Sequence, residues 1–66
     1  MQVTVDVKGE GRSEVTLDGD ATYRDLLDAV GLSPQEATVL VDGRPVPEDR
    51  SVGTEEVTVL RLVRGG

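Results

Sequence analysis

The sequence contains no cysteine and no histidine among its 66 residues. The first absence excludes disulfides, thiolate metal sites and a cysteine nucleophile, and the second removes the commonest general base and metal ligand. Only carboxylates, hydroxyls and the single tyrosine, Tyr23, remain for chemistry. No apolar run is long enough to span a membrane, and the strand-like N-terminus has no secretory apolar region, so we expect a cytoplasmic location. We find no catalytic constellation and no metal site, and we predict that the chain is not an enzyme.

Basic residues are scarce, and lysine is nearly absent. Thirteen acidic residues stand against 7 basic ones, which gives a net charge of −6, and Lys8 is the only lysine. Nucleic acid is a poor partner for such a surface, because phosphate binding needs clustered cations. Acid excess with little lysine resembles proteins of salt-loving archaea, whose carboxylate surfaces stay hydrated in concentrated salt. An ordinary small acidic protein is the alternative interpretation.

The hydrophobic pattern predicts one small domain of strands with a single helix. Apolar alternation and turn residues predict strands at residues 2–8, 13–18, 38–42, 44–46 and 56–63. Helical spacing predicts a helix over residues 23–30, with Thr22 as its cap and Gly31 just past its end. Asp42 and Gly43 form a two-residue hairpin signal, and Pro45 restricts the following strand to a sheet edge. A single helical turn is predicted to begin at Ser33.

This order of elements, ββαβββ, predicts an α+β fold. The helix would cross one face of a mixed sheet, with the first and last strands parallel at its centre. The folded domain would cover residues 1–63, and residues 64–66 would form a flexible tail.

The strand parities predict which side chains face the helix and which do not. We expect the core to comprise Val3, Val5, Val15, Leu17, Tyr23, Leu26, Leu27, Val30, Val39, Val41, Val57 and Val59. Leu40, Leu60 and Leu62 have the opposite parity and should lie on the sheet face away from the helix. Three leucines on adjacent strands favour a docking surface for a partner, although scattered surface leucines are also common.

Gly65 and Gly66 follow the most apolar stretch of the sequence. Glycine loses the most conformational entropy on ordering and contributes no side chain to packing, so this pair has little value as structure. A tail without side chains behind a rigid strand suits a terminal carboxylate that must enter a narrow active site. This pattern indicates that the chemistry of the chain takes place at Gly66.

The element order, the Asp42-Gly43 hairpin with the residues that follow it, and the terminal Arg64-Gly65-Gly66 resemble the ubiquitin-like β-grasp proteins. Within that superfamily the chain is most similar to small archaeal ubiquitin-like modifiers, and the resemblance covers the whole sequence. The sulfur carriers for thiamine and molybdopterin are related prokaryotic members.

The resemblance implies a mechanism, although no cofactor is expected to bind the chain itself. A ubiquitin-activating-type enzyme would use ATP to convert the Gly66 carboxylate into an acyl adenylate. A sulfurtransferase or tRNA-thiolation enzyme would then use a C-terminal thiocarboxylate, or a target-protein lysine would form an isopeptide bond. Arg64 would anchor the tail. Leu40 and Leu60 match the recognition patch of ubiquitin by position, whereas Leu62 falls where ubiquitin has an arginine.

Lys8 is the only lysine that could accept a further modifier, and we expect the protein to be a monomer. A dedicated sulfur carrier for molybdopterin or thiamine synthesis is an alternative, although the proline-containing approach to Gly-Gly that is common in molybdopterin carriers is absent. A second alternative is a non-covalent binding module, in which the leucines dock a partner and the glycines are incidental.

Overall fold

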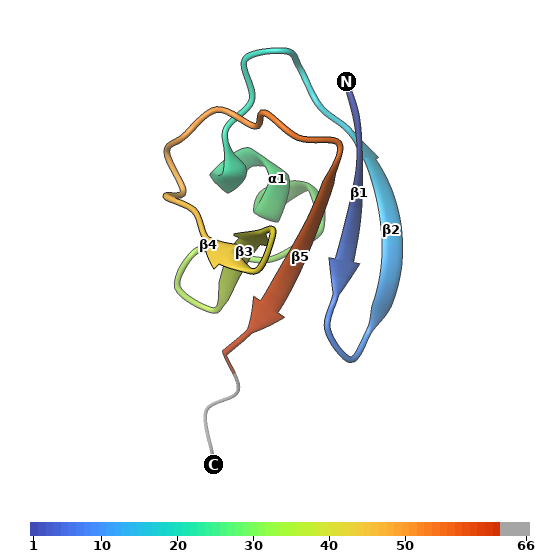
Figure 1. The fold of residues 1–66 in the computed structure, drawn as a ribbon, viewed down its shortest axis with the longest axis vertical. Coiled ribbons are helices and arrows are strands. Elements are labelled where there is room, and N and C mark those ends of the chain that lie inside the picture. Colours follow the sequence, from blue (N-terminus) through green and yellow to red (C-terminus); the bar gives the residue numbers. More distant parts are fainter. Residues whose placement is uncertain (63–66) are drawn as a thin grey trace.

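A computed structural model describes residues 1–62 of the chain (Figure 1). Its element order is ββαβββ, as predicted. The described elements are β1 (Gln2–Val7), β2 (Gly11–Thr16), α1 (Tyr23–Ala29), β3 (Ala37–Val41), β4 (Arg44–Pro45) and β5 (Glu56–Arg61). The expected tail, residues 64–66, and the expected last strand residue, Val63, lie outside the described residues.

The first hairpin joins β1 and β2, and its second strand lies two residues earlier than the predicted range 13–18. The strands are antiparallel, and Val7 pairs with Gly11 at the turn. Gly9 and Gly11 have φ values of 84° and 102°, a region that only glycine adopts readily. The chain therefore reverses immediately after Val7, and the second strand begins at Gly11 instead of Ser13.

Helix α1 begins and ends at the predicted signals. The Thr22 N–H donates to Asp25 Oδ2 at 2.9 Å, and the Asp25 N–H donates to Thr22 Oγ1 at 3.3 Å, which forms a capping box. At the other end Val30 is the C-cap, and Gly31 has a φ of 78°. The seven-residue helix is too short to persist alone and depends on the side chains that it buries against the sheet.

The second hairpin confirms the prediction from Asp42 and Gly43. Both residues have positive φ, 54° and 79°, as a type I′ turn requires, and Val41 pairs with Arg44 across it. Strand β4 is short and contains Pro45, and it lies at an edge of the sheet. This position is the one that a strand proline can occupy without removing a ladder hydrogen bond.

The five described strands form one mixed sheet in the order β2-β1-β5-β3-β4 (Figure 1). Strands β1 and β5 are parallel, and β5 also pairs antiparallel with β3, so the last described strand is the central one. This arrangement confirms the predicted α+β β-grasp architecture.

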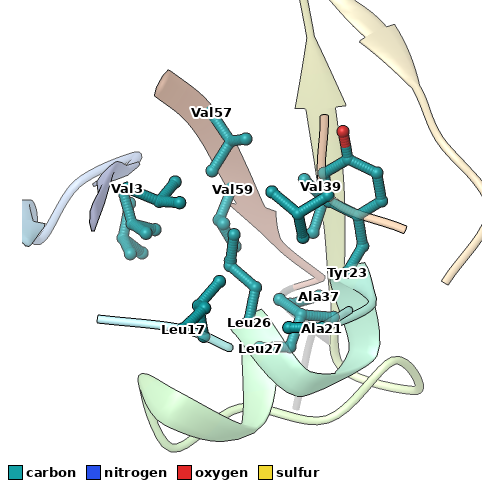
Figure 2. Packing of buried hydrophobic residues seen from close by; sticks show 13 residues of the cluster. Val3, Leu17, Ala21, Tyr23, Leu26, Leu27, Ala37, Val39, Val57 and Val59 are labelled. Carbon is teal, nitrogen blue, oxygen red and sulfur yellow. The ribbon is translucent and has the colours of Figure 1, made fainter. Parts of the chain in front are cut away.

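Helix α1 packs on one face of the sheet and completes a single apolar core (Figure 2). Val15, Val30 and Val41 are only partly buried, because they lie on the edge strand, at the helix end and at the end of β3. The buried residues are Val3, Val5, Val7, Leu17, Ala21, Tyr23, Leu26, Leu27, Ala37, Val39, Val52, Val57 and Val59.

The prediction omitted Val7, Ala21, Ala37 and Val52 from the core. Val52 is the most informative omission, because it lies in the long loop before β5, where no periodic pattern marks it. Its N–H donates to the Ala21 carbonyl at 2.9 Å, which fixes the loop against the start of the helix. The same loop covers Tyr23, which is buried and whose hydroxyl accepts the Gly53 N–H at 3.5 Å.

Candidate functional site

The sheet face opposite the helix carries two of the three predicted leucines on neighbouring strands. Leu60 on β5 lies directly opposite Thr38 of β3, and Leu40 on β3 lies directly opposite Thr58 of β5. Leu40 and Leu60 are therefore diagonal neighbours, at a distance that long side chains can bridge. We call Leu40, Leu60 and Leu62 the leucine patch and this side of the sheet the outer face.

The members of the patch differ in how much surface they offer. Leu60 is 39% exposed and Leu62 is 57% exposed, whereas Leu40 is half-buried and faces Pro45 of β4. Leu60 and Leu62, together with Met1, are the exposed large apolar side chains of the described residues. Most of the apolar area that a partner could cover therefore comes from Leu60 and Leu62.

Leu62 follows the end of β5 and is held by the turn that precedes β3. Its N–H donates to the Glu36 carbonyl at 2.8 Å, which continues the β3–β5 pairing by one residue. The Glu36 carboxylate in turn accepts the Ser33 N–H at 3.2 Å and closes the predicted single turn. Leu62 and this turn line a hollow of about 330 Å³, together with Ser33, Gln35 and Glu36. The end of the described chain is thus tied to the body of the protein through Leu62.

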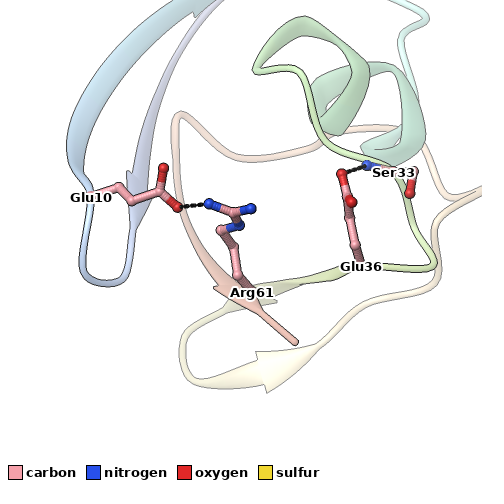
Figure 3. A network of polar contacts seen from close by, with 4 residues as sticks. All are labelled: Glu10, Ser33, Glu36 and Arg61. Carbon is pink, nitrogen blue, oxygen red and sulfur yellow. Dashed lines mark hydrogen bonds and ion pairs between the residues drawn. The ribbon is translucent and has the colours of Figure 1, made fainter. Parts of the chain in front are cut away.

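Arg61 points away from the leucine patch, because neighbouring residues of a strand face opposite sides of a sheet. Its Nη1 lies 2.5 Å from Glu10 Oε2 in the β1–β2 turn, and Glu36 lies on its other side (Figure 3). The hydrogen bond and the charge of Glu10, with a smaller contribution from Glu36, raise the pKa of the Arg61 guanidinium above its ordinary value. Both partners are about half exposed, so this ion pair is screened by salt.

Lys8 lies next to the leucine patch at the end of β1. Val7 pairs with Val59, and the Lys8 N–H donates to the Val59 carbonyl at 3.0 Å, so Lys8 continues the parallel pairing beside Leu60. Lys8 is exposed. The other amine of the chain, at Met1, donates to the Leu17 carbonyl at 2.5 Å and is partly buried. Lys8 is consequently the more accessible of the two amines.

The remaining predicted site residues, Arg64, Gly65 and Gly66, lie outside the described residues. Within residues 1–62 there is no group of three or more potential metal ligands. The helix of this segment is also too short to cross a membrane.

Three contacts at this site were not anticipated from the sequence: the Glu10–Arg61 ion pair, the Leu62–Glu36 hydrogen bond and the position of Lys8 beside Leu60. The alternation of side chains along β5 places Arg61 on the helix side of the sheet. The sequence therefore indicates the direction of this side chain, but not its partner Glu10. The other two depend on the register between strands that are far apart in sequence.

Comparison with known proteins agrees with this geometry. The family model for small archaeal modifier protein 2 matches residues 1–63. Small archaeal modifier protein 2 of Haloferax volcanii is 65% identical over 66 residues, which is the full length of both chains. An uncharacterized protein of Archaeoglobus fulgidus is 36% identical over 53 residues, which cover 80% of this chain and 78% of that protein.

Two solved structures are also similar to this chain. The crystal structure of Haloferax volcanii small archaeal modifier protein 2 superposes with a TM-score of 0.76 at 64% identity and covers 97% of each chain. The crystal structure of SAMP1 from the same organism has a TM-score of 0.76 at 20% identity over the full length of both chains, a likeness of fold alone. With the family model matched over nearly the whole sequence, the chain belongs to the small archaeal modifier protein 2 family of non-enzymatic ubiquitin-like modifiers.

Proposed function

We propose that this protein is a covalent modifier and sulfur carrier that is activated at Gly66. The observation that carries the proposal is the full-length match to a small archaeal modifier protein, combined with the Arg64-Gly65-Gly66 sequence at the end of that match. A terminal carboxylate is a poor electrophile, so a partner enzyme must activate it before transfer.

The activation uses ATP on a ubiquitin-activating-type enzyme. An oxygen of the Gly66 carboxylate attacks the α-phosphate, pyrophosphate leaves, and an acyl adenylate forms. Attack by the ε-amine of a target lysine then expels AMP and forms an isopeptide bond. Attack by sulfide instead expels AMP and leaves a thiocarboxylate for tRNA thiolation. A persulfide donor would expel AMP to form an acyl disulfide, and a second thiol would then reduce this disulfide, forming a disulfide with the carrier sulfur and freeing the thiocarboxylate. In both routes Gly65 and Gly66 have no Cβ that would obstruct a narrow channel leading to the ATP site of the activating enzyme.

The leucine patch would provide the docking surface for the activating enzyme. Leu60 and Leu62 present exposed apolar area close to the point where the chain leaves the sheet, and the Leu62–Glu36 hydrogen bond fixes that point. A partner seated on the patch is therefore near the tail that it must receive. Arg64 would add a charge contact on the tail itself.

The test is incubation of the chain with the host's activating enzyme, ATP and a sulfur donor, followed by intact-mass measurement. We expect a mass corresponding to the thiocarboxylate, and we expect conjugates to appear in cells that express the tagged chain. Deletion of Gly65 and Gly66 should abolish both while the melting temperature stays unchanged. An unchanged mass of the full-length chain, without conjugates in cells, would refute the proposal.

Two alternatives make different predictions in the same experiments. If the chain is a non-covalent module, removal of the glycines has no effect, whereas Leu60→Asp abolishes partner binding. A dedicated carrier for molybdopterin or thiamine synthesis would form the thiocarboxylate but no conjugates, and its deletion would remove that cofactor from the cell.

A further inference from the structure

Strand β2 is the edge of the described sheet that can accept another strand. The opposite edge, β4, has two residues, one of which is Pro45 and lacks an N–H. Strand β2 has six residues without proline, and the four from Gly11 to Glu14 are exposed. A shallow hollow of about 370 Å³ lies beside it on the outer face, lined by Thr4, Arg12, Ser13 and Glu14.

The hydrogen-bonding pattern shows which backbone groups of β2 face away from β1. The Leu17 N–H donates to the Met1 carbonyl at 2.7 Å, and the Met1 amine donates back to the Leu17 carbonyl. In an antiparallel ladder such pairs alternate, so the odd-numbered residues of β2 bond to β1. The backbone groups of Arg12, Glu14 and Thr16 therefore point away from β1.

Among the registers centred on the exposed residues Arg12, Ser13 and Glu14, the charges favour one pairing with a second copy of the chain. In a two-fold antiparallel pair, outward-pointing residues must face outward-pointing residues. With the axis at Ser13, Arg12 of each copy lies opposite Glu14 of the other, and opposite charges meet twice. With the axis at Arg12 or at Glu14, identical charges meet directly, which is unfavourable. Among the described residues, neither Arg12 nor Glu14 makes an ion pair within its own chain.

We propose that two copies of this protein pair through their β2 edges, antiparallel about Ser13, to form one continuous sheet. Each Arg12–Glu14 pair exchanges both of its backbone hydrogen bonds, and the two side chains meet on the outer face. The interface leaves the leucine patch uncovered, because β1 lies between β2 and the central strand β5.

The pairing is weak, because the interface is small and each copy carries a net charge of −6. The chain is monomeric in dilute solution, as the sequence predicts, and pairs at millimolar concentration. Copies attached to neighbouring lysines of one target would be held at such concentrations by their linkage. This last consequence rests on the proposed function, whereas the pairing itself is tested on the free chain.

The test follows the backbone amide chemical shifts by NMR as the free protein is concentrated from micromolar to millimolar. We expect the largest changes at Arg12 and Glu14, whose backbone groups form the new hydrogen bonds, with smaller changes at Gly11, Ser13 and Val15. R12E and E14R should each weaken self-association by about tenfold or more, since each reverses two symmetry-related contacts. The double variant R12E/E14R restores opposite charges and should recover the pairing, and an equimolar mixture of the two single variants should form a mixed pair.

R24E is the matched control, because it changes the net charge as R12E does but lies on the exposed face of the helix. R12Q is a milder variant, in case a carboxylate at position 12, opposite Asp6, destabilises the first hairpin. Absence of concentration-dependent shifts in the wild-type protein would overturn the proposal. Equal effects of R12E and R24E would do the same, because they would reveal only long-range repulsion. Shifts centred on Leu60 would show that copies meet through the leucine patch instead.

Discussion

If the activating enzyme docks on the leucine patch as proposed, removal of the exposed apolar area there should weaken its binding by an amount that can be worked out from the exposed fractions of Leu60 and Leu62. Full burial of a leucine side chain is worth about 1.5–3 kcal/mol. Leu60 is 39% exposed, so docking can gain about 0.6–1.2 kcal/mol from it, and Leu62, at 57%, offers about 0.9–1.7 kcal/mol. The sum is about 1.5–2.9 kcal/mol, which corresponds to about a 10- to 100-fold change in affinity.

The double variant Leu60→Ala, Leu62→Ala should therefore raise the KM for the modifier in ATP–pyrophosphate exchange by about 10- to 100-fold. The maximal rate should change little, because the proposed reacting group, the Gly66 carboxylate, is unaltered. Each single variant should give part of the effect, and Leu62→Ala should give the larger part. The reason is that Leu62 exposes more area and contributes less to the fold.

Val15→Ala is the matched control for loss of stability. Val15 is partly buried on β2, away from the leucine patch, so its truncation should lower the melting temperature without changing KM. An unchanged KM in the leucine double variant, or an equal rise in Val15→Ala, would refute the assignment of the patch as a docking surface.

Three further predictions concern the body of the protein. Leu26→Ala should lower the free energy of unfolding by about 2–5 kcal/mol in urea denaturation, because the Leu26 side chain of α1 is fully buried in the core; a loss below about 1 kcal/mol, comparable to that of an exposed site, would contradict the described core. Thr22→Ala should cost about 1 kcal/mol through loss of the capping box, and Thr22→Ser, which keeps the hydroxyl, should recover most of it. The melting temperature should rise from dilute buffer to molar salt, since a net charge of −6 repels itself at low ionic strength; a melting temperature independent of salt would show that the acid excess has no such role.

The local elements of the fold were predictable because each has its own chemical signal. Asp42 and Gly43 specify a turn with two positive φ values, and Thr22 with Asp25 specifies a helix start. Parity along each strand then placed Leu60 on the outer face and Val59 in the core. These features depend on residues that are close in sequence, so a single chain is enough to find them.

The long-range contacts of Arg61 and Val52 were not predictable in the same way. The Glu10–Arg61 pair joins residues 51 positions apart, and it requires both the parallel β1–β5 pairing and the early turn at Gly9. Val52 has no periodic neighbours, so its burial follows only from the path of the loop against Ala21. The proposed role of the leucine patch depends on the surface of a partner protein, and the sequence of this chain carries no information about that surface.

Strand β5 presents two different surfaces to a partner. Leu60 offers apolar area on the outer face, whereas Arg61 lies on the helix side between Glu10 and Glu36. Apolar contact is insensitive to moderate salt, and the exposed ion pair is not. A modifier that works in concentrated salt would therefore depend on the leucines for affinity and on backbone hydrogen bonds, such as Leu62 to Glu36, for the position of the chain at Leu62. It follows that substitutions at the leucines should impair activation at every ionic strength, whereas any effect of Glu10→Gln should fade as salt is added.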